Sequence, residues 1–187
     1  RSLHEAWAVN TTGGLAHRTP IGWTDPVYPD TTYHRSLRGI DIVQPRIGWA
    51  VGANAASGGP AILHMTDGAS WSVVPGPTGA NQDLLDVYAA TSTTAWVVGQ
   101  GQHIYYYNGG GWVDRTPLSA ISGEALYKVY SPNDQTVFVI GTNGTVLRSI
   151  DNGVTWSNLT LPGTGGGILT GIASVDGKNI WIGGSFG

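Results

Sequence analysis

Asp41 and Asp86 are the two acidic residues whose positions could suit catalysis. Glycoside hydrolases commonly use a pair of carboxyl groups that face each other across the scissile bond. Both aspartates lie in short apolar segments that we expect to form the innermost strands of neighbouring repeats. Polar groups at such places more often line a central channel than carry out a reaction, so we expect no catalysis from this pair.

Sialidase chemistry finds less support in the sequence. It would need clustered arginines around a carboxylate, a nucleophilic tyrosine with a glutamate, and an acidic proton donor. The only glutamates are Glu5 and Glu124. The seven arginines are scattered, at positions 1, 18, 35, 38, 46, 115 and 148. No spacing groups these residues, and we predict that the chain is not an enzyme.

The innermost strands also offer the best candidate binding surface, because several polar and aromatic residues are expected to face the channel there. These residues are Arg38, Asp41, Asp86, Tyr88, Lys128 and Tyr130. A second aromatic group, Tyr105 to Tyr107, alternates between the two faces of an expected strand, which favours core filling. A sugar-stacking platform is the alternative interpretation of those tyrosines.

The sequence indicates neither a cofactor nor a metal. Five histidines stand at positions 4, 17, 34, 64 and 103 without the spacing of metal ligands, and the chain has no cysteine. The glycine-rich stretch 163–167 lacks the Lys-Ser/Thr pair that would make it a phosphate loop.

The charge and composition exclude some partners. Charged residues make up 11% of the chain, the net charge is -3, and the nine basic residues form no cluster, which argues against nucleic acid. No apolar run approaches the ~18 residues of a membrane-spanning helix. Little lysine and abundant Thr, Ser, Gly and Asn favour an exported protein that is secreted, periplasmic or at the cell surface. Three sequons, at Asn10, Asn143 and Asn158, are close to what chance gives in such a chain.

An internal repeat organises the whole chain. Apolar strands that mostly end in glycine begin at Trp7, Trp49, Trp96, Phe138 and Trp181, at intervals of 42, 47, 42 and 43 residues. A second set of tryptophans follows at positions 23, 71, 112 and 156, at intervals of 48, 41 and 44 residues. Two independent aromatic markers with one period of this length indicate a repeat architecture.

Each full repeat divides into four short strands separated by Gly, Pro and Asn turns. The expected strands are 37–43, 48–52, 61–65 and 71–74, then 84–89, 95–99, 103–107 and 112–114, then 126–130, 136–141, 145–149 and 155–159. Four strands per repeat of about 40–45 residues predict an all-β fold, a β-propeller of four-stranded blades. A β-sandwich would not give two aromatic markers at a fixed period, and a β-helix has shorter rungs.

The position of each marker within its repeat sets the expected organisation of residues 1–187 as a single propeller domain or fragment. The units are a partial blade 1–23 without its first strand, an insertion loop 24–36, blades 37–83, 84–124 and 125–167, and a partial blade 168–187 with two strands. About four and a half blades do not close into a clean ring. We therefore expect the chain to be part of a larger propeller, completed by further blades or by another chain.

One stretch carries a family resemblance. Ser149-Ile-Asp151-Asn-Gly153-Val-Thr155-Trp156 resembles the Asp-box, or bacterial neuraminidase repeat, at every defined position. Asp67-Gly68-Ala-Ser-Trp71 looks like a shorter copy. The resemblance implies that these residues hold a turn at the outer rim of a blade. With the Trp-Ala-Val-Gly strand, the units resemble propellers of photosystem II assembly and stability factors and their exported bacterial relatives.

The resemblance implies a fold more firmly than a function, since sialidases, xyloglucanase-type hydrolases and sorting receptors also use Asp-box propellers. We expect a non-catalytic exported propeller that acts as a protein-binding or assembly scaffold. Its expected partners are other proteins or the rest of the same propeller. The alternative is a carbohydrate-active propeller, either a fragment of a glycoside hydrolase or a lectin-like module that binds glycans.

Overall fold

The computed structural model describes residues 5–55, 58–117, 125–133, 135–159, 163 and 166–185. Of the residues discussed above, Arg1, His4 and Glu124 lie outside the described residues, as do parts of the stretches 1–23, 37–83, 84–124, 125–167 and 168–187. Within the described residues, no helix is long and apolar enough to cross a membrane. A short helical turn, η1, covers Thr142–Gly144.

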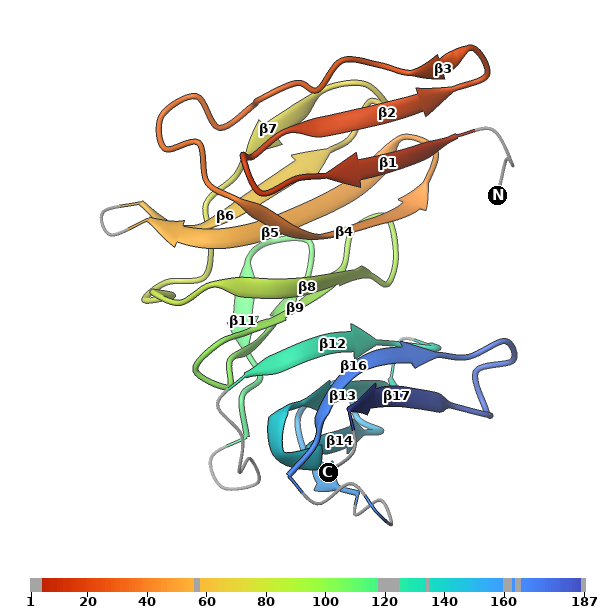
Figure 1. Cartoon of the computed structure of the whole chain (residues 1–187). Coiled ribbons are helices and arrows are strands. Elements are labelled where there is room, and N and C mark those ends of the chain that lie inside the picture. Colours follow the sequence, from red (N-terminus) through yellow and green to blue (C-terminus); the bar gives the residue numbers. More distant parts are fainter. Residues whose placement is uncertain are drawn as a thin grey trace.

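Five antiparallel sheets follow one another along the chain, and the strands of each sheet are arranged in chain order (Figure 1). The first sheet contains β1 (Ala6–Val9), β2 (Leu15–Thr19) and β3 (Gly22–Trp23). The second contains β4 (Leu37–Gln44), β5 (Ile47–Ala55), β6 (Gly59–Met65) and β7 (Trp71–Val73). The third contains β8 (Leu84–Ala89), β9 (Ala95–Gly99), β10 (Ile104–Tyr107) and β11 (Trp112–Asp114). The fourth contains β12 (Leu126–Tyr130), β13 (Val137–Gly141), β14 (Val146–Ser149) and β15 (Ser157–Asn158), and the fifth β16 (Ile168–Ala173) and β17 (Trp181–Ser185).

The sheets stack face to face in chain order, from the β1–β3 sheet at one end to the β16–β17 sheet at the other (Figure 1). Their first strands β4, β8, β12 and β16 contact one another in series, and we call these four strands the inner row. Every residue of β9 and β13 is buried, because both faces of a middle sheet are covered by its neighbours. This explains why the second strands are apolar without alternation.

The core lies between adjacent sheets and is built around a repeated aromatic contact. The tryptophan on β1, β5 or β9, which are the second strands of their repeats, meets the tryptophan at the outer strand of the next sheet, edge to face. The pairs are Trp7–Trp71 at 5.5 Å, Trp49–Trp112 at 5.6 Å and Trp96–Trp156 at 6.3 Å between ring centroids. Edge-to-face packing is the favoured arrangement of aromatic rings at these separations. The two markers of the sequence repeat therefore meet across the sheet interfaces.

In the first and second sheets, the tryptophan that begins the repeated apolar strand is also covered within its own sheet by the histidine directly opposite on the next strand. His17 stacks on Trp7 at 4.3 Å, and His64 stacks on Trp49 at 3.8 Å. Burial lowers the pKa of His64, which keeps the imidazole neutral against the indole ring. These two histidines thus pack in the sheets.

A glycine recurs three residues after the aromatic of the second strands β5, β9, β13 and β17 because the first strand of the same sheet passes very close to it. A Cβ on Gly52 would collide with the backbone of Ser36 and Leu37, and one on Gly99 with Asp83 and Leu84. The corresponding residue of the first sheet is Asn10. Its side chain is accommodated because, in the described part of the chain, β1 pairs with β2 alone.

The expected all-β propeller fold is confirmed, and most strand limits agree with the expectation to within one or two residues. The larger differences are at β5, which extends to Ala55, and β15, which is only Ser157–Asn158. The three-stranded first sheet and the two-stranded fifth sheet follow the expected strand order. The limits assigned to each unit and the completion of a larger propeller stay predictions.

Candidate functional site

The inner row brings five of the six channel-face candidates together. Asp41 lies on β4, Asp86 and Tyr88 on β8, and Lys128 and Tyr130 on β12. These three strands contact one another in series, and among the five side chains Lys128 pairs with Asp86 and Tyr88 meets Tyr130. We call these five residues the polar strip.

Asp86 is the most buried member of the strip, with 7% of its surface exposed. One carboxylate oxygen accepts a hydrogen bond from Lys128 Nζ at 2.7 Å, and the other accepts one from the Val129 backbone N–H at 3.1 Å. Burial raises the pKa of Asp86, and the charge of nearby Asp41 adds to this effect. The charge and the hydrogen bond of Lys128 lower the pKa of Asp86. The Lys128 side chain is 40% exposed, so solvent screens its charge, and the effect of burial is larger, so the pKa of Asp86 stays raised.

Asp41 performs a similar structural task from the neighbouring strand. Its carboxylate accepts hydrogen bonds from the backbone N–H groups of Ala89 and Ile42, each at 2.9 Å. The bond to Ala89 ties β4 to β8, just as the bond from Val129 to Asp86 ties β8 to β12. Asp41 is opposite Trp49, whereas Asp86 is opposite Val98, so the two carboxylates connect adjacent sheets from different positions of the repeat.

Two tyrosines complete the strip. Tyr88 and Tyr130 are half-buried, and their rings meet edge to face with centroids 5.4 Å apart. Both stand opposite the second-strand aromatic of their own sheet, Trp96 and Phe138 respectively. The strip can therefore offer two ring surfaces and an ammonium group to a bound molecule, while the carboxylate oxygens are already engaged within the protein.

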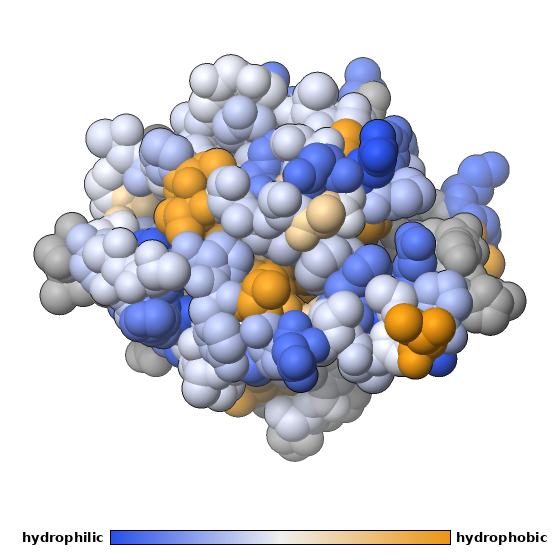
Figure 2. Space-filling view, turned by 90° about the horizontal axis from the view of Figure 1, so that it is seen from above, coloured by the Kyte–Doolittle hydropathy of each residue, from blue (hydrophilic) through white to orange (hydrophobic). Residues whose placement is uncertain are grey.

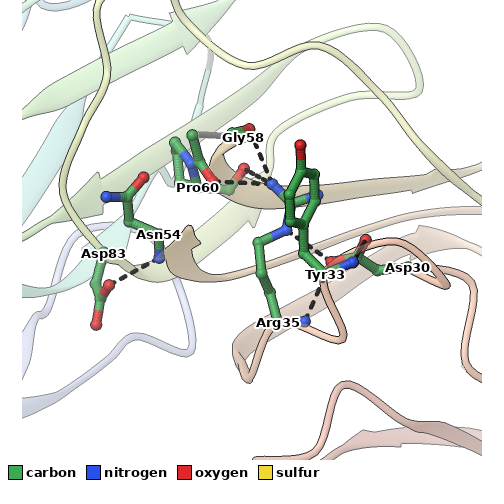
Figure 3. Close-up of polar contacts among 8 residues, drawn as sticks. Asp30, Tyr33, Arg35, Asn54, Gly58, Pro60 and Asp83 are labelled. Carbon is green, nitrogen blue, oxygen red and sulfur yellow. Dashed lines mark hydrogen bonds and ion pairs between the residues drawn. The ribbon is translucent and has the colours of Figure 1, made fainter. Parts of the chain in front are cut away.

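Arg38 does not join the strip. It is unpaired at a register irregularity between Leu37 and Gly39, which recurs at the matching place in β8, β12 and β16. Its guanidinium instead pairs with Asp83 at 2.6 Å in an exposed position. Asp83 also accepts a hydrogen bond from the Asn54 backbone N–H at 2.8 Å (Figure 3).

Sequence reasoning missed a buried ion pair in the insertion loop 24–36. Arg35 Nε donates to Asp30 at 2.6 Å, and both side chains are almost fully buried. Arg35 also donates to the carbonyls of Gly58, Gly59 and Pro60, at the β5–β6 hairpin (Figure 3). Burial raises the pKa of Asp30. Hydrogen bonds from Arg35 and from the Tyr33 backbone together lower it by more than burial raises it, so the pKa lies below its usual value. Nothing in the sequence pattern distinguishes this pair from exposed charges.

The Ser149–Trp156 stretch holds a turn through hydrogen bonds centred on Asp151. Its carboxylate accepts from the Thr155 backbone N–H at 2.9 Å, from the Thr155 hydroxyl at 2.6 Å and from the Ser149 hydroxyl at 2.7 Å. The hydrogen bonds from Thr155 and Ser149 lower the pKa of Asp151 to about 2. The Gly153 N–H donates to Ser149 Oγ at 2.8 Å, and Trp156 Nε1 donates to the Arg115 carbonyl of the preceding sheet at 2.8 Å. Every polar contact of Asp151 thus serves the turn.

Related turns occur elsewhere in the chain. Asp67 accepts from the N–H groups of Ser70 and Ala69, which lowers its pKa to about 2. Trp71, which follows, is buried against Trp7, and Gly68 adopts a positive φ of 84°. Sequence reasoning missed a third such turn, in which Asp176 accepts from the N–H groups of Lys178 and Asn179 between β16 and β17. The assignment of these turns to the Asp-box family stays a prediction.

Two cavities lie at the ends of the stack. One of about 320 Å³ lies between β1 and β4 and is lined by Glu5, Ala6, Trp7 and residues 40–45. Another, of about 460 Å³, lies beside Phe138 and is lined by residues of the fourth sheet together with Gly177, Lys178 and Ile180. Among the described residues, no group of three or more His, Asp or Glu side chains could hold a metal ion.

Stacked antiparallel sheets with adjoining first strands define the blades of a β-propeller. Solved structures with this fold resemble the chain. YCF48 from Cyanidioschyzon merolae matches with a TM-score of 0.73 and 16% identity, over 98% of this chain and 64% of its own. The extracellular domain of the putative hybrid two-component system BT3049 from B. thetaiotaomicron matches with a TM-score of 0.62 and 17% identity, over 96% of this chain and 27% of its own. No family model and no curated protein matches the sequence.

These likenesses show the fold alone, because the identities are low. The chain spans less than two thirds of the YCF48 structure that it matches. Neither comparison transfers a site to this chain, and the polar strip of the inner row has to be interpreted from its own contacts.

Proposed function

We propose that the chain is a non-catalytic, exported propeller module that binds other proteins through the polar strip of the inner row. The observation that carries this proposal is the engagement of the strip's two carboxylates. Asp41 and Asp86 accept backbone hydrogen bonds from the adjacent sheet, and Asp86 also pairs with Lys128. Carboxylates held in this way support the scaffold and present a fixed polar surface.

The chemistry of the strip suits a polypeptide partner. Lys128 is partly exposed and can pair with an acidic group, while the Tyr88 and Tyr130 rings can cover apolar side chains. Tyrosines are frequent at protein interfaces because they combine apolar area with a hydroxyl group. Export is favoured by the composition and is compatible with the extracellular propeller domain of the BT3049 system.

Cross-linking can test this function sharply, because the chain has only two lysines, Lys128 and Lys178. A lysine-reactive cross-linker added to the protein in an extract of its source should link partners through Lys128. Lys178 lies in the turn between β16 and β17, which is not part of the strip, and is the internal control. Lys128→Arg should remove the links, and a Tyr88→Ala/Tyr130→Ala variant should reduce their yield about tenfold. Links that come only from Lys178 would contradict the proposal.

A carbohydrate-active propeller is the second candidate, and one observation favours it. Burial raises the pKa of Asp86, and the nearby charge of Asp41 contributes to this rise; a carboxyl group with a raised pKa is what glycosidases use as the general acid. Hydrolysis of a panel of polysaccharides would be measured for the native protein and for Asp86→Asn. Activity that is lost in Asp86→Asn would establish this second function in place of the first.

A further inference from the structure

We propose that Asn108 is a site of spontaneous covalent modification, at which the backbone nitrogen of Gly109 attacks the side-chain amide and converts it to a carboxylate. This inference goes beyond the proposed binding function and concerns the turn between β10 and β11. The reaction consumes water and releases ammonia. The folded turn, and not the Asn-Gly sequence alone, selects this asparagine.

Three asparagines precede a glycine, at positions 108, 143 and 152. In such a pair the glycine nitrogen can attack the side-chain carbonyl carbon Cγ, because glycine has no side chain to hinder the approach. A bond forms between this nitrogen and Cγ, and the bond between Cγ and Nδ2 breaks. The proton of the glycine nitrogen passes through solvent to the leaving ammonia. Water then opens the five-membered imide at either of its two carbonyls, which gives aspartate or isoaspartate.

The Asn108 turn provides both an activated carbonyl and an available nitrogen. Asn108 Oδ1 accepts hydrogen bonds from the backbone N–H groups of Gly110 at 2.9 Å and Gly111 at 3.1 Å. These donors stabilise the negative charge that develops on Oδ1 during the attack, as in an oxyanion hole. Among the described residues the Gly109 N–H has no hydrogen-bond acceptor, and both Asn108 and Gly109 are exposed to the solvent that removes its proton.

The other two pairs lack an available glycine nitrogen. The Gly153 N–H donates to Ser149 Oγ at 2.8 Å, and Gly153 is buried. Asn152 Oδ1 is buried without a hydrogen-bond partner among the described residues, so no donor activates its carbonyl. The Gly144 N–H donates to the Gly167 carbonyl at 2.8 Å. An N–H held in a hydrogen bond has to lose that bond before its nitrogen can react, so both pairs should react slowly in the folded protein.

An aspartate product fits the turn, because Asp67 already has the same arrangement. Asp67 accepts the N–H groups two and three residues on, those of Ala69 and Ser70, as Asn108 does in its own turn. These hydrogen bonds lower the pKa of Asp67 to about 2. A carboxylate at position 108 would therefore be ionised as well, and it would add one negative charge to the net charge of -3.

An isoaspartate product would instead disturb the packing of the outer strand. It places an extra methylene in the main chain between β10 and β11, and Trp112 is the first residue of β11. Trp112 meets Trp49 edge to face at 5.6 Å, and its Nε1 donates to the Pro75 carbonyl at 3.1 Å. A shift of β11 would therefore loosen the contact between the second and third sheets.

Peptide mapping by mass spectrometry tests the proposal on the intact, folded protein. Trypsin cleaves after lysine and arginine and leaves the three Asn-Gly pairs in separate peptides, 47–115, 129–148 and 149–178. During incubation at about pH 8, the first peptide should gain about 1 Da at Asn108, and this reaction should be about tenfold faster than those of the other two pairs.

The same incubation in urea is the control, because the turns are lost there and the three rates should converge. Equal rates in the folded protein, or a faster reaction at Asn143 or Asn152, would overturn the proposal. The same order of rates in urea as in the folded protein would assign the selection to the local sequence and would also overturn it.

Two variants examine the turn itself. Asn108→Asp has no side-chain amide to lose, so peptide 47–115 should no longer gain mass; a gain that persists would place the site elsewhere and refute the proposal. Gly111→Pro removes one of the two donors to Oδ1, at a position where a Cβ meets open space, and should slow the reaction at Asn108 about tenfold. Slow reactions at Asn143 and Asn152 in the same sample show that the fold persists. An unchanged rate at Asn108 in that folded sample would contradict the activation assigned to the turn.

Discussion

Three aspartates in this chain have different physical roles. Asp67 is exposed and Asp151 is partly exposed, and hydrogen bonds from nearby backbone and hydroxyl groups hold the pKa of each at about 2. Asp86 is buried between two sheets, and its pKa is raised. An acidic side chain in a turn therefore favours its ionised form through local donors, whereas one on an inner strand carries a desolvation cost.

The Asp151 turn gives a prediction about pH. Because its folded-state pKa is below the ordinary value of 3.8, ionised Asp151 stabilises the fold above that value, and this contribution is lost as the pH falls toward about 2. In Thr155→Val the hydroxyl donor is missing, so the Asp151 pKa should rise toward 3.8. NMR titration of the side-chain carboxyl would measure it, with Asp176 as an internal control that should stay near 2. An unchanged Asp151 pKa would contradict the role assigned to Thr155.

For Asp86, the predicted pH dependence of stability has the opposite sign. A raised pKa means that ionisation costs stability as the pH rises through the folded-state value. Asp86→Asn cannot ionise, and its amide oxygen can still accept the Val129 N–H. This variant should therefore be at least as stable as the native protein at pH 7. Any difference in stability between the two proteins should disappear in acid, where native Asp86 is protonated. Asp86→Ala leaves that N–H without an acceptor and should cost about 1–3 kcal/mol. Urea unfolding at pH 7 and pH 4 would measure both, and equal losses in the two variants would argue against this account.

At the scale of strands and sheets, the edge-to-face tryptophan contact is the principal packing device. Trp96 is 1% exposed and meets Trp156 of the next sheet. Trp181 occupies the same place in its repeat but is 57% exposed, because it belongs to the last described sheet. The same residue type at the same repeat position thus experiences two very different environments.

This difference predicts unequal effects of one substitution. Trp96→Ala should cost about 3–5 kcal/mol of folding free energy, since it opens a cavity between two sheets. Trp181→Ala should change the stability by less than about 0.5 kcal/mol. Chemical denaturation of the two variants would compare them directly. Similar losses would indicate that Trp181 is covered in solution, by a further blade or by another chain.

The insertion loop is attached to the second sheet by the Asp30–Arg35 pair (Figure 3). Arg35→Met removes the cation but leaves the buried carboxylate, which should cost about 3–5 kcal/mol at neutral pH. Adding Asp30→Asn should recover part of this loss, because the amide is uncharged and its one oxygen can still accept one of the two backbone N–H groups, of Tyr33 and Arg35, that bond to the two carboxylate oxygens. Thermal unfolding of the single and double variants would test this, and a double variant less stable than Arg35→Met would contradict it.

At the scale of the whole molecule, the sequence predicted the architecture well but only part of the candidate site. The aromatic and glycine markers repeat because each sheet meets its neighbour in the same way, so their period reveals the strands. Five strip residues were found because strand order alone places them on the inner row. Arg38 also lies on the inner row, but its pairing with Asp83 could not be read from the sequence, and its part in binding stays a prediction. The Asp30–Arg35 pair was missed because its other partners, the carbonyls of Gly58 and Pro60, come from a distant hairpin.

The arrangement of the sheets also makes stability uneven along the chain. The β8–β11 sheet is covered on both faces, whereas within the described residues each of the two end sheets is covered on one face only. Figure 2 looks onto the β1–β3 end and shows apolar side chains there in separate patches among polar ones. In stacked repeats each unit is stabilised mainly by its nearest neighbours.

Native-state hydrogen exchange should therefore show the slowest amides in β9 and β13, every residue of which is buried, and much faster exchange in β17. Trp96→Ala, at the interface of the third and fourth sheets, should accelerate exchange in β9 and β13 far more than in β5. Trp181→Ala is the matched control and should leave all three strands unchanged. Uniform exchange across the five sheets, or equal acceleration of β5 and β13 by Trp96→Ala, would show that the stack unfolds as one cooperative unit.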